Sequence, residues 1–177
     1  PVFALAHLLG IQLMPRIRGI QDLKFHRPQA GAVYQNINAL FSDVIDWPLI
    51  ELHLPAMLRV AVSIKTGKIT PSAILRRLGT YSRKNKLYFA FVELGKVIRT
   101  MFLLSYIGDV GLRKVIHAET NKSEQFNGFA GWSFFGGEGI IAENIRHEQR
   151  KVIKYNHLVA NMIILHNVVG MTKVLQE

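Results

Sequence analysis

Residues 120–127 read Thr120-Asn121-Lys122-Ser123-Glu124-Gln125-Phe126-Asn127, and this stretch predicts the start of a helix that ends near residue 135. Asn121 is a good N-cap, because its side-chain oxygen can accept a backbone N–H that the first turn leaves unsatisfied. Glu124 then falls three residues after the cap, where a carboxylate can reach back to it. Phe126, Phe129 and Ala130 follow at helical spacing and predict an apolar stripe beside Glu124.

Two interpretations of Glu124 follow from this pattern. The first is a capping acid, which stabilises a helix start by about 1 kcal/mol or less. The second is a metal-binding carboxylate at the mouth of a cleft, which needs partner ligands that the spacing alone does not supply. The two differ in where the carboxylate lies, because an acid folded back onto its own helix start is not available to a metal.

The bulk composition narrows the class of protein. At 177 residues the chain suits one domain with a sizeable core. Its net charge of +10 indicates a polyanionic partner, for which nucleic acid is the usual case and an anionic membrane surface the rival. The sequence has no cysteine, which excludes disulfides, thiol nucleophiles and cysteine-ligated zinc. No uninterrupted apolar run reaches the roughly 18 residues of a membrane span, so no membrane partner is expected.

The remaining pattern is mostly helical. Residues 2–9 predict a short helix that Gly10 ends, and residues 11–17 predict a strand followed by a basic turn. From about residue 30 the pattern is helical as far as residue 118, with Asp46 and Thr70 as N-caps. The other expected helices cover residues 72–78, 85–107, 109–118 and 146–169. Gly136, Gly137 and Gly139 predict a tight turn.

Several further segments carry distinctive motifs. They are Leu8-Leu9-Gly10…Pro15-Arg16-Ile17-Arg18, Met57-Leu58-Arg59-Val60-Ala61, Leu75-Arg76-Arg77-Leu78-Gly79-Thr80-Tyr81, Glu93-Leu94-Gly95-Lys96-Val97-Ile98-Arg99-Thr100, Phe134-Phe135-Gly136-Gly137-Glu138-Gly139 and His147-Glu148-Gln149-Arg150. In this order, and together with Asn121-Lys122-Ser123-Glu124, they resemble the C-terminal catalytic region of Tn-three family transposases, which are DDE enzymes.

The resemblance implies a mainly α fold with a partial RNase H-like α/β catalytic core. Residues 1–29 would form the last helix and strand of the RNase H-like sheet, residues 30–118 a helical insertion, and residues 119–177 the acid-bearing helix and the C-terminal helix. The whole would be a single partial catalytic domain, truncated at its N-terminus.

The resemblance also implies a reaction. Glu124 matches the third acid of the Asp-Asp-Glu triad, and is therefore the expected catalytic residue and metal ligand. Two Mg²⁺ ions in such enzymes promote 3′-end cleavage and strand transfer at transposon ends. Both triad aspartates would precede Pro1, so this chain is expected to be inactive alone.

The expected partner is double-stranded DNA, at transposon ends and at the target. A homo-oligomer of the full-length enzyme and a bacterial cytoplasmic, nucleoid-associated location are further implications of the resemblance.

Three groups of basic residues are candidates for contact with the DNA backbone. The first follows the expected strand and includes Arg16, Arg18, Lys24 and Arg27; the second surrounds Tyr81 and includes Arg76, Arg77, Arg83, Lys84 and Lys86; the third lies on the last helix and includes Arg146, Arg150, Lys151 and Lys154. Lys122 joins them beside Glu124. A charge run by itself is often only a solvated face, but in so basic a chain phosphate contact is favoured.

Alternative chemistry is less well supported. Glu138, Glu143 and Glu148 are alternative acids for metal ligation, but Glu143 and Glu148 flank a basic stretch and are expected in surface ion pairs. The seven histidines include no His-x-x-x-His pair, which argues against zinc. The alternative to an enzyme fragment is a helical DNA-binding or assembly module without catalysis.

Overall fold

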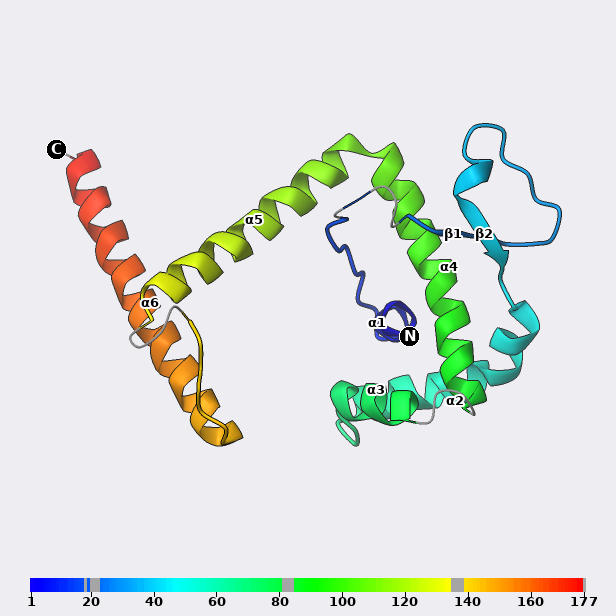
Figure 1. Cartoon of the computed structure of the whole chain (residues 1–177), viewed down its shortest axis with the longest axis horizontal. Coiled ribbons are helices and arrows are strands. Elements are labelled where there is room, and N and C mark those ends of the chain that lie inside the picture. Colours follow the sequence, from blue (N-terminus) through cyan, green and yellow to red (C-terminus); the bar gives the residue numbers. More distant parts are fainter. Residues whose placement is uncertain (18, 20–22, 81–84, 135–138, 177) are drawn as a thin grey trace. The chain divides into compact units, whose positions relative to one another are not determined.

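The computed structural model describes residues 1–17, 19, 23–80, 85–134 and 139–176. These residues form two compact units, Pro1–Ile116 and His117–Glu177, each with its own packing. The helices are α1 (Val2–Leu8), α2 (Trp47–Lys65), α3 (Pro71–Thr80), α4 (Lys86–Gly108), α5 (Val110–Trp132) and α6 (Arg146–Gln176), and the strands are β1 (Phe25–Arg27) and β2 (Phe41–Val44) (Figure 1). The mainly α class is confirmed, whereas the RNase H-like core stays a prediction.

The predicted helix before Gly10 is confirmed, and the predicted strand after it is wrong. Helix α1 ends at Leu8, and Gly10 has a φ of +80°, a left-handed conformation that suits glycine. Residues 11–17 belong to no helix or strand. Within the described part of the chain, no strand lies beside them to accept their hydrogen bonds, and Pro15 has no N–H to donate.

The helical block does not begin near residue 30. Instead the chain forms a loop, a short 3₁₀ helix (Asn38–Leu40) and β2, which pairs in parallel with β1. The guanidinium of Arg27 holds this loop: it donates to the carbonyl oxygens of Ala32 at 3.2 Å and Phe41 at 3.1 Å, and to Oδ1 of Asn38 at 2.9 Å. Arg27 therefore stabilises this loop, and its contact with DNA stays a prediction.

The predicted N-caps Asp46 and Thr70 are confirmed, and Asn85 is a further cap that was not predicted. Oγ1 of Thr70 accepts the backbone N–H of Ala73 at 3.4 Å at the start of α3. Oδ1 of Asp46 accepts the backbone N–H of Leu49 at 3.0 Å, and α2 then runs for 19 residues. Oδ1 of Asn85 accepts the N–H of Tyr88 at 3.3 Å at the start of α4.

Helix α4 is the centre of the first unit. Phe91 and Leu103 are fully buried on it, in two separate apolar clusters. Phe91 packs with residues of α1, α2 and α3, and Leu103 packs with residues of β1 and β2. Towards the end of α4 two apolar side chains are exposed, Met101 by 60% and Leu104 by 41%.

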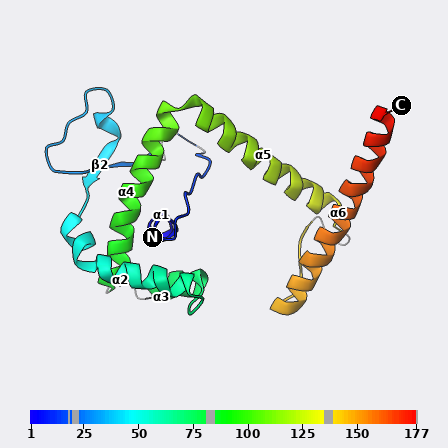
Figure 2. The ribbon, with the colours of Figure 1, turned by 180° about the vertical axis from the view of Figure 1, so that it is seen from behind.

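Close packing of α1 on α4 occurs at Gly95, and both ribbon views show these helices together (Figure 2). A Cβ atom at Gly95 would lie 3.6 Å from the backbone nitrogen of Pro1. This is an ordinary van der Waals distance, so an alanine would fit at Gly95 without a shift of α1.

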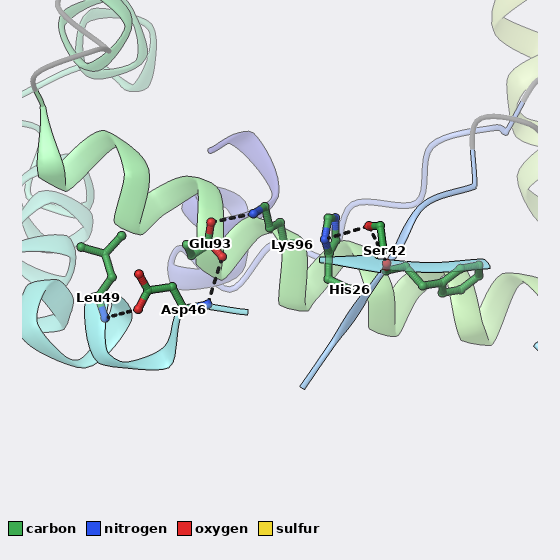
Figure 3. Close-up of polar contacts among 7 residues, drawn as sticks. His26, Ser42, Asp46, Leu49, Glu93 and Lys96 are labelled. Atoms are coloured by element: carbon green, nitrogen blue, oxygen red, sulfur yellow. Dashed lines mark hydrogen bonds and ion pairs between the residues drawn. The ribbon is translucent and has the colours of Figure 1, made fainter. Parts of the chain in front are cut away.

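Polar contacts tie α2 and the sheet to α4, and Figure 3 shows those of Glu93 and Ser42. Oε2 of Glu93 accepts the backbone N–H of Asp46 at 3.2 Å, and its Oε1 accepts Nζ of Lys96 at 2.6 Å. In the sheet, the backbone N–H of His26 donates to the buried Thr100 on α4 at 3.1 Å, and Oγ of Ser42 donates to the carbonyl of Phe25 at 3.1 Å. These contacts fix the start of α2 and the edge of β1 against one helix.

Helices α2 and α6 are long and apolar enough to cross a membrane by length and composition alone, with mean hydropathies of 1.2 and 1.5. The same test is passed by core helices of soluble proteins, so this is weak evidence. The sequence expectation considered only uninterrupted apolar runs. In α6 the residues that interrupt the apolar run are uncharged asparagine and histidine.

Substitution of Phe91 by alanine is expected to lower the free energy of unfolding by about 3–5 kcal/mol, because it empties a fully buried site. Phe89→Ala is the matched control, two residues away on α4 and 42% exposed, and should have a much smaller effect. Chemical denaturation followed by circular dichroism measures both. Equal losses for the two variants would contradict the core described for α4.

A pH dependence is expected from His26. Burial, and then the charge of Lys96, lower the pKa of His26 below its ordinary 6.5, while Asp43 and Glu93 oppose the shift. Below pH 6.5 the unfolded chain therefore binds this proton before the folded one does. Stability should be full above pH 6.5 and should decline as the pH falls from there towards the folded-state pKa.

Denaturation midpoints at pH 5 and pH 7 test this expectation. His26→Gln should reduce the difference between the two pH values, whereas a control variant, His166→Gln on the exposed surface of α6, should leave it unchanged. An undiminished difference in His26→Gln would assign the acid sensitivity to other groups.

Candidate functional site

Glu124 lies in the middle of α5 rather than at its start. The helix begins after Asp109, whose Oδ1 accepts the backbone N–H of Leu112 at 3.0 Å, and it continues without a break to Trp132. Between Leu112 and Asn127 the sequence contains no glycine or proline that would end a helix. The predicted N-cap at Asn121 is therefore wrong, and so is the capping box with Glu124.

This correction removes one of the two interpretations of Glu124. Backbone N–H groups in the interior of a helix are bonded to the carbonyls four residues earlier, so no free N–H needs a carboxylate here. Glu124 is exposed on α5, and its side chain is not folded onto a helix start.

The predicted apolar stripe beside Glu124 is confirmed, and it holds α6 against α5. The ring of Phe126 meets that of His157 edge-on, with centroids 5.6 Å apart, and Ala130 is buried. Nδ2 of Asn156 donates to the carbonyl of Ala130 at 2.9 Å. Sequence patterns gave no signal for this last contact, because it joins residues 26 positions apart on different helices.

A small cavity of about 190 Å³ lies where these helices meet. Asn127, Asn156 and His157 are among its lining residues, whereas Glu124 is not. The expected cleft at Glu124 is therefore not this cavity.

The metal-binding potential of the described residues is limited to single carboxylates. No group of three His, Asp or Glu side chains lies close enough to hold a metal ion among the residues that the structure describes. Two alternative acids have contacts in their own segment: Oε1 of Glu143 accepts the backbone N–H of Ile145 at 3.0 Å, and Glu148 pairs with Lys151 at 2.7 Å. Glu138 lies outside the described residues. A two-metal site thus does not fit these residues alone, and Glu124 offers one ligand.

The candidate DNA-binding cations are only partly brought together. On α6, Arg146, Arg150 and Lys154 are exposed and four residues apart, which places them along one side of the helix. Lys122 pairs with Glu119 at 2.6 Å, as Lys151 does with Glu148. Both pairs are on the surface, where such pairs are weak and leave the cations accessible to phosphate.

The remaining candidates belong to the first unit or lie outside the described residues. Arg16, Arg76 and Arg77 are exposed in the first unit. Arg18, Arg83 and Lys84 are outside the described part of the chain, as are Gly136 and Gly137 of the predicted turn.

Comparison with known proteins identifies the family. The family described as "Tn3 transposase DDE domain" matches residues 1–177. The transposase for transposon Tn21 of Escherichia coli is similar: it is 39% identical over 95% of this chain and 17% of the relative. The transposase for transposon Tn501 of Pseudomonas aeruginosa is 38% identical over 99% of this chain and 18% of the relative. The transposase for Tn1546 of Enterococcus faecium is 36% identical over 97% of the chain and 17% of the relative.

The chain therefore spans under a fifth of the length of these relatives. No solved structure matches it. Glu124 is exposed on a continuous helix, within the motif that carries the resemblance. Because the family match extends from the first residue to the last, the chain belongs to the Tn3 transposase DDE domain family.

Proposed function

We propose that residues 1–177 are part of the catalytic domain of a DDE transposase and that Glu124 is the third acid of its triad. The observation that carries the proposal is the exposed carboxylate of Glu124 on α5, in a chain whose whole length matches the DDE domain family. An acid that does no capping and lies on the surface of a rigid helix is suited to bind an ion held jointly with other segments.

The other two acids of the triad, by this proposal, belong to the longer transposase and lie outside residues 1–177. Divalent cations such as Mg²⁺ prefer carboxylate oxygen ligands, and bound there they would supply charge stabilisation for phosphoryl transfer at transposon ends. Within this chain Glu124 would hold such an ion. The RNase H-like core of the complete domain is part of the same proposal.

Double-stranded DNA is the proposed partner. A net charge of +10 and the row of Arg146, Arg150 and Lys154 on α6 support contact with the phosphate backbone. Such contacts would position DNA without reading its sequence. Action on transposon ends as a homo-oligomer, in the bacterial cytoplasm with the nucleoid, completes the proposal.

A non-catalytic helical module remains the competing function. The observation that favours it is the lack of a metal-binding group of three side chains among the described residues. The two functions differ in whether Glu124 is needed for strand transfer.

In the longer transposase, Glu124→Gln is expected to abolish strand transfer, because the amide keeps the shape but loses the charge that binds a divalent ion. Glu119→Gln is the matched control, five residues earlier on the same helix and also exposed. Cleavage and strand transfer on labelled transposon-end DNA measure the activity, and gel shifts measure DNA binding.

Loss of activity in Glu124→Gln with DNA binding intact is the expected result, with Glu119→Gln close to the unsubstituted protein. Strand transfer at the normal rate in Glu124→Gln would remove Glu124 from the mechanism and favour the non-catalytic module.

The cations of α6 give a separate prediction about DNA binding. The double variant Arg150→Ala/Lys154→Ala should weaken binding to all duplexes alike and reduce the slope of log affinity against log salt by about 2, roughly one unit for each lost phosphate contact. Lys173→Ala, near the other end of α6, is the control. A salt titration by fluorescence anisotropy measures both slopes, and an unchanged slope in the double variant would exclude this row of cations from the DNA interface.

A further inference from the structure

Helix α6 leaves most of its apolar surface uncovered in its unit. Ala160 is its one buried residue among those described. Five apolar residues follow one another along α6 at intervals of three or four and are between 45% and 66% exposed: Tyr155, Leu158, Met162, Leu165 and Val169. This spacing of three and four is typical of a helix that packs along a partner. The five residues are called the α6 stripe below.

The α6 stripe faces away from α5. Asn156 contacts α5 through the carbonyl of Ala130. Nine residues, or about two and a half turns of an α-helix, separate Asn156 from Leu165, so the two lie on opposite sides of α6. Helix α5 therefore contacts α6 on the side that carries Asn156 and leaves the stripe to a different occupant.

The chemistry of the stripe indicates an apolar protein surface as that occupant. From Tyr155 to Thr172 the sequence contains no Asp, Glu, Lys or Arg, in contrast to the cationic row that ends at Lys154. DNA would contact the cationic end of the helix, whereas the stripe offers no charge to a phosphate. Exposed apolar surface on this scale marks an interaction site.

We propose that the α6 stripe is the docking surface for the segment of the longer transposase that carries the other two acids of the triad. The inference rests on the proposed function of Glu124. More than four fifths of the length of the relatives lies outside the region matched by this chain, so ample polypeptide exists to cover the stripe.

The location of the stripe supports this occupant. Helix α6 and the Glu124 region of α5 belong to one compact unit, His117–Glu177, held together by Phe126, His157 and Asn156. Ligands of one metal site must lie within a few ångströms of each other, so the segment that brings the aspartates must pack against this unit. The stripe is an extended apolar surface that such packing would bury. Its residues are positioning residues for Glu124 and do not touch the reacting atoms.

The test places the photo-cross-linking residue p-benzoylphenylalanine at Leu165 of the longer transposase. The protein carries Glu124→Gln and no DNA is present, so the result does not depend on catalysis or on DNA binding. Asn167 is the matched control, because it is exposed and two residues further on, which turns it to the opposite side of α6. Cross-linked peptides are identified by mass spectrometry.

Cross-links from position 165 to peptides of the same molecule outside residues 1–177, with none from position 167, are the expected result. Capture of residues 1–116, or of a second copy distinguished by isotope labelling, would overturn the proposal. So would the absence of any cross-link at position 165, and flotation of the protein with phosphatidylglycerol vesicles would then identify a membrane surface as the occupant. If Glu124→Gln transfers strands at the normal rate, the proposed role of Glu124 fails but the cross-links from position 165 are unchanged. The two proposals therefore fail separately.

Discussion

The burial of α4 on two sides is the constraint on which the first unit depends. Phe91 and Leu103 are both fully buried, and twelve residues along a helix turn the side chain by about 120°. One covering layer cannot bury both positions. Helices α1 and α2 therefore pack on one part of α4 and the two strands on another. The polar contacts of Glu93 and Thr100 then fix the start of α2 and the position of β1 on this helix.

Local signals predicted the helices well and the strands poorly. Asp46 and Thr70 cap helices through contacts within three residues, which a sequence displays directly. The pairing of β1 with β2, and the contacts that Arg27 makes with the loop between them, join residues up to 17 positions apart. Nothing in the strand residues themselves specifies such partners, and an arginine that holds carbonyl groups has the same sequence pattern as one that contacts DNA.

The candidate site shows how two separate arguments for one residue can fare differently, because the capping argument for Glu124 is wrong whereas its proposed catalytic role stays a prediction. Spacing made Asn121 a cap and Glu124 a capping acid, but a cap has a function only where backbone N–H groups lack partners. Helix α5 already runs from Asp109, so the N–H groups near Asn121 are bonded within the helix. The resemblance of the motif, and not its capping pattern, identified Glu124. Spacing alone did predict the row of Arg146, Arg150 and Lys154, because that row needs only the periodicity of one helix.

The continuity of α5 also has a consequence for metal binding. A carboxylate shared with distant segments is useful only if its backbone is held to within about half an ångström, which elements of regular structure achieve better than loops. Glu124 lies two residues before Phe126 and six before Ala130, the positions where α5 is anchored to α6. At 1.5 Å per residue these anchors lie about 3 and 9 Å along the helix axis from Glu124. The Phe126–His157 ring contact and the Asn156–Ala130 hydrogen bond therefore join α5 to α6 within about two turns of Glu124.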